Sequence, residues 1–332
     1  MNEPLRPMTL GEILDRTFQI YRAKFWVFAG IAAVPALVML GINLADVFWL
    51  HVHSIISPSP KSATLWNSVI WLAYFHVSAF LGLLISVAHV HVTSRTSSGE
   101  KSSIPIAFQF AGARWRSYLW IAVLKFSAGL LVPEILFVVL IFGEAAIAIF
   151  AGAFTGNRES AVSSALLMSA FPAIAGCALF AWLGGRLALA IPAAALEELA
   201  GIKALRRSWL LSKGSCTRII LTWAVIFFCS WILMTGAQRT LRWIFFYLYR
   251  GHLLGSLSQH LYLPTSYLLY AIISVLTGPI YPIALTLFYY DQRIRREGYD
   301  IERMMEAAGL NAPLIPPATD GLTASGSEEA QP

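Results

Sequence analysis

The chain contains six long apolar stretches, and their length constrains its fold more than any other feature. They are Phe25–Leu50, Leu65–Val92, Tyr118–Phe150, Val162–Leu196, Ile219–Met234 and Ser266–Tyr290. An α-helix needs about 20 residues to cross about 30 Å of hydrocarbon, and each stretch is near or beyond that length. The pattern predicts an all-α, polytopic integral membrane bundle of six transmembrane helices with short interfacial amphipathic helices.

The composition agrees with a membrane protein. Apolar residues make up 57% of the 332 residues and charged residues only 13%, whereas about 25% of a soluble globular protein is charged. The three cysteines, Cys177, Cys216 and Cys229, lie in or beside predicted spans and have no C-x-x-C spacing. Their number and placement argue against a disulfide framework and against a thiolate metal site.

The positions of lysine and arginine predict the topology. With six spans, 17 of the 24 basic residues fall on the face that carries both termini, 5 fall on the opposite face, and Lys125 and Arg186 lie inside spans. Cytoplasmic loops carry the excess of positive charge. We therefore expect a multi-pass protein of the cell inner membrane with both termini in the cytoplasm.

The last external connection, Thr235–Thr265, is unusually long. Its first part mixes aromatic residues with Arg239, Arg242 and Arg250, and such residues favour the membrane interface. We favour a separate helix lying on or dipping into the outer leaflet. The alternative is that the fifth span is longer and tilted.

Three similar segments precede the three predicted membrane hairpins. They are TLGEILDRTFQIYRAKFWVF from Thr9, SSIPIAFQFAGARWRSYLWI from Ser102 and AGIKALRRSWLLSKGSCTRI from Ala200. Shifts of 94 and then 97 residues align Thr17 with Ala111 and Ser208. Membrane folds are often built from internal repeats, although any cytoplasmic loop between spans tends to be basic and amphipathic. Each segment predicts a short amphipathic helix at the inner membrane face, followed by two spans.

The first of these segments, within residues 1–24, has the clearest helix signals. Its apolar residues recur at spacings of three and four and give one apolar stripe. They are Leu10, Ile13, Leu14, Phe18 and Tyr21. Thr9 followed by Glu12 matches a capping box, which predicts that the helix begins just after Thr9.

Three motifs resemble a known membrane family. They are RPMTLGEILDRTFQIYRAKFW from Arg6, RLALAIPAAALEELAGIKALRRSWLLSKG from Arg186 and YYDQRIRREGYDIE from Tyr289. In order and placement they resemble the glycerophosphoryl diester phosphodiesterase membrane domain family, over about residues 6–302. One departure is the turn Glu198–Gly201, which is usually shorter in that family.

The resemblance implies the membrane domain alone. Family members are sometimes joined to a catalytic phosphodiesterase barrel, but such a barrel needs about 250 residues, which this chain cannot spare. The carboxylates outside the spans are also scattered, whereas metal-assisted phosphodiester hydrolysis needs several that converge. We therefore expect no enzyme activity, no catalytic residues and no cofactor.

Ionisable residues inside the spans mark a candidate polar site. Lys125, Glu134 and Arg186 are its members, and Glu144 is a further carboxylate within the third span. Such residues are costly in lipid and usually face protein or a water-filled cavity. Three interpretations remain open: a structural ion pair such as Glu134 with Arg186 or snorkelling, a pocket for an anionic lipid head group, or a proton-coupled relay.

The histidine pairs do not predict a metal site. His51 and His53, like His89 and His91, are two residues apart, so on a helix their side chains point in different directions. The two pairs also fall at opposite ends of the first hairpin. Interfacial histidines are the simpler interpretation, and no metal is expected.

These observations divide the chain into four parts. Residues 1–24 form a cytoplasmic helix, 25–290 the six-span domain, 291–309 an exposed cytoplasmic helical extension, and 310–332 a disordered tail rich in Pro, Ala, Gly and Ser. The function that fits is a non-catalytic scaffold or accessory domain that binds lipid or a membrane protein partner. The alternative is a small-solute or lipid transporter, and nothing indicates a nucleic-acid partner.

Overall fold

A computed structural model describes residues 6–56, 60–128, 170–251 and 257–299, together with scattered residues between 133 and 150 and between 301 and 305. Its described part is helical, without strands. The helices are α1 (Leu10–Ala23), α2 (Phe25–Ile56), α3 (Pro60–Ser97), α4 (Ile104–Ala113), α5 (Trp115–Phe126), α8 (Ala170–Leu187), α9 (Ala190–Leu196), α10 (Ile202–Leu211), α11 (Cys216–Arg250), α12 (Leu257–Thr277) and α13 (Ile280–Glu297).

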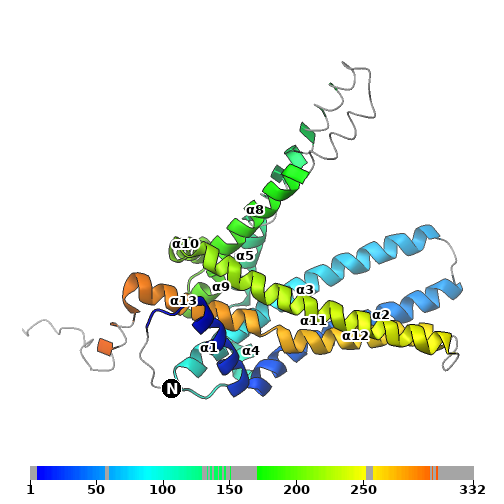
Figure 1. The fold of residues 1–332 in the computed structure, drawn as a ribbon, viewed down its shortest axis with the longest axis horizontal. Coiled ribbons are helices and arrows are strands. Elements are labelled where there is room, and N and C mark those ends of the chain that lie inside the picture. Colours follow the sequence, from blue (N-terminus) through cyan, green and yellow to red (C-terminus); the bar gives the residue numbers. More distant parts are fainter. Residues whose placement is uncertain are drawn as a thin grey trace, which may run out of the picture.

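Long apolar helices form arms that spread from one end of the molecule (Figure 1). The helices α2 and α3 make one hairpin, α11 and α12 make a second, and α5 and α8 begin a third. Within the described residues, five segments are long and apolar enough to cross a membrane. The predicted multi-pass, all-helical class is confirmed to that extent. The third predicted span lies largely outside the described residues, so the count of six stays a prediction.

The interfacial helix favoured after Thr235 is wrong. Instead, α11 runs without interruption for 35 residues, from Cys216 to Arg250, which is the alternative of a longer fifth span. No proline interrupts this stretch, and a single glycine such as Gly236 costs an exposed helix only about 1 kcal/mol relative to alanine. At 1.5 Å per residue the helix is about 52 Å long, so it exceeds the hydrocarbon thickness.

The three repeated segments each form a short helix, a break and a second helix, which is long in α2 and α11 and has 12 residues in α5. The short helices α1, α4 and α10 are named the collar helices below. Lys24 follows α1 with φ −129° and ψ 33°, and Arg114 follows α4 with φ −125° and ψ 28°. Ser215, which aligns with Lys24, precedes α11 with φ −121° and ψ 5°. The short helix and the break are therefore present in all three units, while the two spans expected after them are described for the first and third units only.

Burial follows the sequence alignment of the collar helices. The aligned residues Thr17, Ala111 and Ser208 are at most 1% exposed, and so are the aligned residues Ile13, Ala107 and Ala204. The same two positions therefore face the core in each unit. One expectation fails in detail, since α4 carries no charged residue and is apolar rather than amphipathic.

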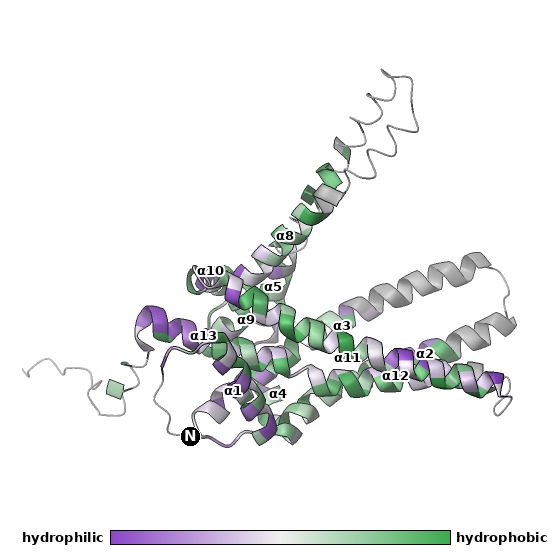
Figure 2. Ribbon diagram, viewed as in Figure 1, coloured by the Kyte–Doolittle hydropathy of each residue, from purple (hydrophilic) through white to green (hydrophobic). Residues whose placement is uncertain are grey.

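The collar helices surround a core made by the returning ends of the three hairpins. The ends of α3, α9 and α13 contact one another, while α1 packs against α13, α4 against α3 and α10 against α9. Each collar helix thus packs on the return helix of the preceding unit, which closes a ring. We call this ring of six helices the hub. Figure 2 shows polar residues gathered there and apolar residues along the arms.

Two of the return helices are interrupted where they enter the hub. The helix α8 ends at Leu187 and α9 begins at Ala190, while α12 ends at Thr277 and α13 begins at Ile280. Pro279, directly before α13, cannot donate a backbone hydrogen bond to α12. The expected exposed extension over 291–309 is wrong in its first part, because Asp291, Gln292 and Ile294 are buried. The helix α13 then ends at Glu297, with Gly298 in the left-handed conformation at φ 64°.

A buried aspartate ties the N-terminal segment to the hub. Asp291 has a fully buried side chain and accepts hydrogen bonds from the backbone N–H of Met8 at 2.7 Å and from Arg295 Nε at 3.0 Å. Arg218 lies 3.5 Å away and Gln292 donates at 3.0 Å. Arg218 and Arg295 also donate to the Met8 carbonyl. The carboxylate therefore joins the beginning of the chain to α11 and α13.

A second charged cluster links α9, α10 and the end of α13. Arg207 donates to Glu197 at 2.7 Å and also pairs with Glu297. The hydrogen bonds that Arg207 donates to Glu297, and then those that it donates to Glu197, raise the pKa of Arg207 above its ordinary value. Tyr289 donates its hydroxyl to Glu197. Both clusters lie in the hub and join units that are far apart in the sequence.

Candidate functional site

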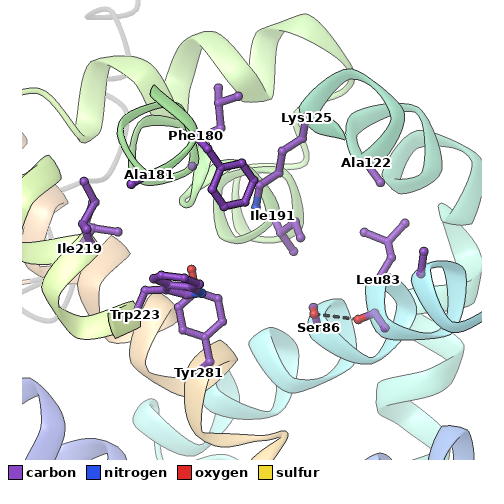
Figure 3. Close-up of a pocket in the computed structure, with 16 residues that line it drawn as sticks. Leu83, Ser86, Ala122, Lys125, Phe180, Ala181, Ile191, Ile219, Trp223 and Tyr281 are labelled. Carbon is purple, nitrogen blue, oxygen red and sulfur yellow. Dashed lines mark hydrogen bonds between the residues drawn. The ribbon is translucent and has the colours of Figure 1, made fainter. Parts of the chain in front are cut away.

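A cavity of about 500 Å³ lies where the arms leave the hub. Its walls come from α3, α5, α8, α9, α11 and α13, so residues from all three hairpins contribute (Figure 3). The lining is mainly apolar and includes Leu83, Phe180, Ile191, Ile219 and Trp223. Ligand pockets in proteins occupy about 300–1,000 Å³ and combine apolar walls with a few polar groups. The cavity has that size and character.

Lys125 supplies the single charged side chain among the lining residues. It lies in the last turn of α5 and extends into the cavity toward Ile191 (Figure 3). Lys125 has no hydrogen-bond or ion-pair partner among the described residues. Lys125 faces a cavity between helices of the three hairpins. The ammonium group is therefore available to a ligand.

Arg186 lies near this cavity but is directed elsewhere. Its guanidinium carbon is 5.6 Å from the ring centroid of Trp182 and 5.0 Å from that of Trp209. Within the described part of the chain, its Nε and Nη1 atoms are buried without a hydrogen-bond partner. The Arg186 carbonyl accepts hydrogen bonds from Ser208 and Ser212 of the third unit. Arg186 thus stacks between tryptophans, and it is not among the residues lining the cavity.

Glu134, the third predicted site residue, lies outside the described residues, as does Glu144. The proposed pairing of Glu134 with Arg186 therefore stays a prediction. The two glycines before Arg186 behave differently from each other. A Cβ atom at Gly185 would lie 2.8 Å from both Cys216 and Ile220 of α11, whereas one at Gly184 would meet nothing within 4 Å. Close approach of α8 and α11 depends on Gly185 alone.

The described histidine pair is directed to two different helices. His89 is buried against α2, with Nε2 3.3 Å from the Phe28 carbonyl oxygen. The ring of His91 stacks on Phe110 of α4 at 4.1 Å. The two rings therefore diverge, as expected for a spacing of two on a helix. The side chains of His51 and His53 lie outside the described residues.

Sequence patterns missed the aromatic residues of the cavity. Trp223 and Tyr281 line it from α11 and α13 (Figure 3). Inside apolar spans these residues have no periodicity that separates them from lipid-facing aromatics. The charged Lys125 was detectable because a charge stands out in an apolar segment.

The arrangement suits binding of an amphiphile with a negative charge. An anionic group would contact the Lys125 ammonium, and apolar chains would contact the surrounding walls. Among the described residues, no group of three or more histidine, cysteine or acidic side chains is placed to hold a metal ion. Comparison with known proteins found no matching family model, no matching curated protein and no matching solved structure.

Proposed function

We propose that the protein is a non-catalytic membrane protein whose cavity binds an anionic lipid through Lys125. The observation that carries the proposal is a single ammonium group in an apolar cavity of about 500 Å³ with contributions from all three hairpins. This choice selects the second interpretation of the intramembrane charges, a pocket for an anionic head group, over a structural ion pair or a proton relay.

The energetics of a buried charge support a negative ligand. A lysine at membrane depth is unfavourable by about 2.5–3.5 kcal/mol on insertion scales. None of the other lining residues carries a charge. A phosphate or carboxylate would offset part of that cost, because charge-assisted hydrogen bonds are roughly twice as strong as neutral ones. The apolar lining would accommodate hydrocarbon chains at the same time.

The hub suits the scaffold role that the sequence indicates. On our topology it faces the cytoplasm, because the basic residues of the predicted cytoplasmic loops surround it. The three segments that resemble the glycerophosphoryl diester phosphodiesterase membrane domain family all reach the hub, where Met8, Arg207 and Asp291 join them. Membership of that family fits this arrangement and stays part of the proposal. A membrane protein partner would dock on the same face.

The broken return helices favour one alternative, a lipid or small-solute transporter. Discontinuous helices near a central site are typical of transporters, and the interruptions at residues 188–189 and 278–279 both lie next to the hub. Gly278 has a close contact of its own, because a Cβ atom there would lie 2.7 Å from the Ser274 carbonyl oxygen. The repeats run in parallel rather than in inverted order, which favours binding over transport.

Native mass spectrometry of the purified full-length protein tests the proposal. Phosphatidylglycerol and phosphatidylcholine with identical acyl chains would be compared as anionic and zwitterionic probes. We expect the protein to prefer phosphatidylglycerol about tenfold, a difference that corresponds to about 1.4 kcal/mol. Lys125→Met should remove the preference and Lys125→Arg should keep it.

Lys203→Met is the matched control, because Lys203 is an exposed lysine on α10. This variant should retain the preference for phosphatidylglycerol. An unchanged preference in Lys125→Met would overturn the proposed site. Lipid movement across proteoliposome membranes that requires Lys125 would favour the transporter instead.

A further inference from the structure

A second cavity of about 380 Å³ lies between α2, α3, α12 and the start of α13. It shares Gly82, Ser86 and Tyr281 with the first cavity, and Figure 3 labels Ser86 and Tyr281 among the residues of that first cavity. The second cavity has no lysine or arginine among its lining residues. Its chemistry therefore differs from that of the site around Lys125.

His89 lines this second cavity and has an unused hydrogen-bond acceptor. Its side chain is 0% exposed, and Nε2 lies 3.3 Å from the carbonyl oxygen of Phe28. A carbonyl can only accept, so Nε2 must carry the proton of this contact. In the neutral ring Nδ1 is then a lone-pair acceptor, and it is buried without a partner among the described residues. A ligand that donates a hydrogen bond would satisfy it.

Other polar groups of the cavity also have acceptor atoms left over. Asn43 donates its amide N–H to the Met39 carbonyl at 2.7 Å, Ser86 donates to Gly82 at 2.7 Å, and Ser274 donates to Ala271 at 2.8 Å. Each side chain donates one hydrogen bond to a carbonyl of its own helix, and its oxygen atom keeps lone pairs that can accept another hydrogen bond. These three side chains therefore keep free acceptor atoms at the cavity wall.

Aromatic rings and a carboxylate add a preference for positive charge. Tyr74, Tyr267, Tyr270 and Tyr281 all line the cavity, and the face of a tyrosine ring attracts cations. Asp46 lies one helical turn beyond the lining residue Asn43 and interacts electrostatically with Tyr267. Its Oδ1 atom is buried without a hydrogen-bond partner in the described part of the chain.

We propose that this second cavity binds a protonated primary amine. An ammonium group has three donors and a positive charge, which match the acceptors of His89 and Asn43 and the tyrosine faces. Asp46 does not line the cavity, but it adds a negative charge one helical turn from Asn43. The amine could belong to an ethanolamine-type lipid head group or to a free organic amine, since both present the same group. The proposal does not depend on Lys125, because Lys125 does not line this cavity.

The test uses full-length protein in phosphatidylcholine nanodiscs at pH 7.4 with two probes. Ligand-observed nuclear magnetic resonance would compare benzylammonium with benzyl alcohol, its neutral counterpart. Native mass spectrometry would compare phosphatidylethanolamine with phosphatidylcholine. We expect benzylammonium, phosphatidylethanolamine or both to be preferred about tenfold over the paired probe. Preference for the lipid alone identifies a head-group site, and preference for benzylammonium alone identifies a site for free amines.

Two variants and a matched control assign the binding to this cavity. Asp46→Asn removes the charge while keeping the shape, and His89→Phe removes the acceptor, so both should reduce the preference about tenfold. If His89→Phe does not fold, Asp46→Asn decides the outcome alone.

Asp15→Asn, at an exposed aspartate of α1, should leave binding unchanged. The proposal is overturned if neither amine probe is preferred or if Asp46→Asn retains the full preference. Lys125→Met should not affect amine binding, whatever its effect on phosphatidylglycerol.

Discussion

The hub and the arms use their polar residues in opposite ways. In the hub, Asp291 receives hydrogen bonds from a backbone amide and from arginine and glutamine side chains, and Arg207 is held by two glutamates. In the arms, Lys125 has no hydrogen-bond or ion-pair partner among the described residues. The charged clusters of the hub therefore hold segments together, while the charge of Lys125 is available to a ligand.

This difference shows how the protein separates stability from binding. The hub ties three units into a ring through pairs that span large sequence separations, such as Met8 with Asp291 and Arg207 with Glu297. Breaking such a pair leaves an uncompensated charge, which is strongly destabilising. An unpaired group in an arm already bears that cost in the folded protein. Its removal should affect ligand binding more than folding.

The largest effect is expected from Asp291→Leu. The substitution would leave Arg218 and Arg295 facing each other and the Met8 amide without its acceptor. Removing one partner of a buried pair costs about 3–5 kcal/mol, and we expect about 3 kcal/mol because both arginines remain partly exposed. Thermal unfolding in detergent would measure the loss. Asp15→Leu, at an exposed site on α1, is the control and should change stability little.

A smaller loss is expected where the third arm meets the second. Gly185→Ala would place a Cβ atom 2.8 Å from Ile220 and Cys216, and overpacking of this kind costs about 1–3 kcal/mol. Gly184→Ala is the matched control, because its Cβ atom meets nothing within 4 Å. That control should be stabilised by up to about 1 kcal/mol through helix propensity. Equal unfolding temperatures for the two variants would show that α8 and α11 do not pack as described.

The sequence predicts the units of this fold better than their assembly. Long apolar stretches and the capping box at Thr9 correctly locate α2, α3 and the beginning of α1. The alignment of Thr17, Ala111 and Ser208 correctly identifies positions of equal burial. These features are local, because helix periodicity and caps depend on residues that lie close together in the sequence. In the ring, each collar helix packs on the preceding unit. This packing depends on contacts between distant segments, which local sequence patterns do not predict.

In the candidate site too, local sequence patterns predict some residues and miss others. Lys125 was predictable because a charge in an apolar span rarely faces lipid, and its cavity agrees with that expectation. Its neighbours Trp223 and Tyr281 were not predictable, since aromatic residues are common at both protein-facing and lipid-facing positions. The continuity of α11 through Arg239 and Arg242 was also misjudged, because interfacial residues mark depth rather than a helix end.

A capping variant tests how much the collar contributes to the hub. In α1 the Thr9 hydroxyl accepts from the Glu12 amide at 3.3 Å, and Glu12 accepts from the Thr9 amide at 2.6 Å. The Thr9 amide, before any other contact, lowers the pKa of Glu12. Thr9→Ala should cost about 1 kcal/mol, measured by thermal unfolding. Thr9→Ser keeps the hydroxyl and should behave like the natural protein, whereas equal losses in both variants would show that the cap is not the cause.

The smallest effect on stability is expected from Lys125→Met, and it separates the two regions most sharply. Methionine retains the unbranched stem of lysine, so packing against the cavity wall should persist while the charge disappears. Because the ammonium has no partner among the described residues, its removal breaks no pair, and the variant should unfold at the same temperature as the natural protein or at a higher one. The same variant should lose its preference for phosphatidylglycerol. Destabilisation similar to that of Asp291→Leu would mean that Lys125 is a structural charge like those of the hub. The contrast between hub and arms would then fail, since a charge in an arm would also be holding the fold together.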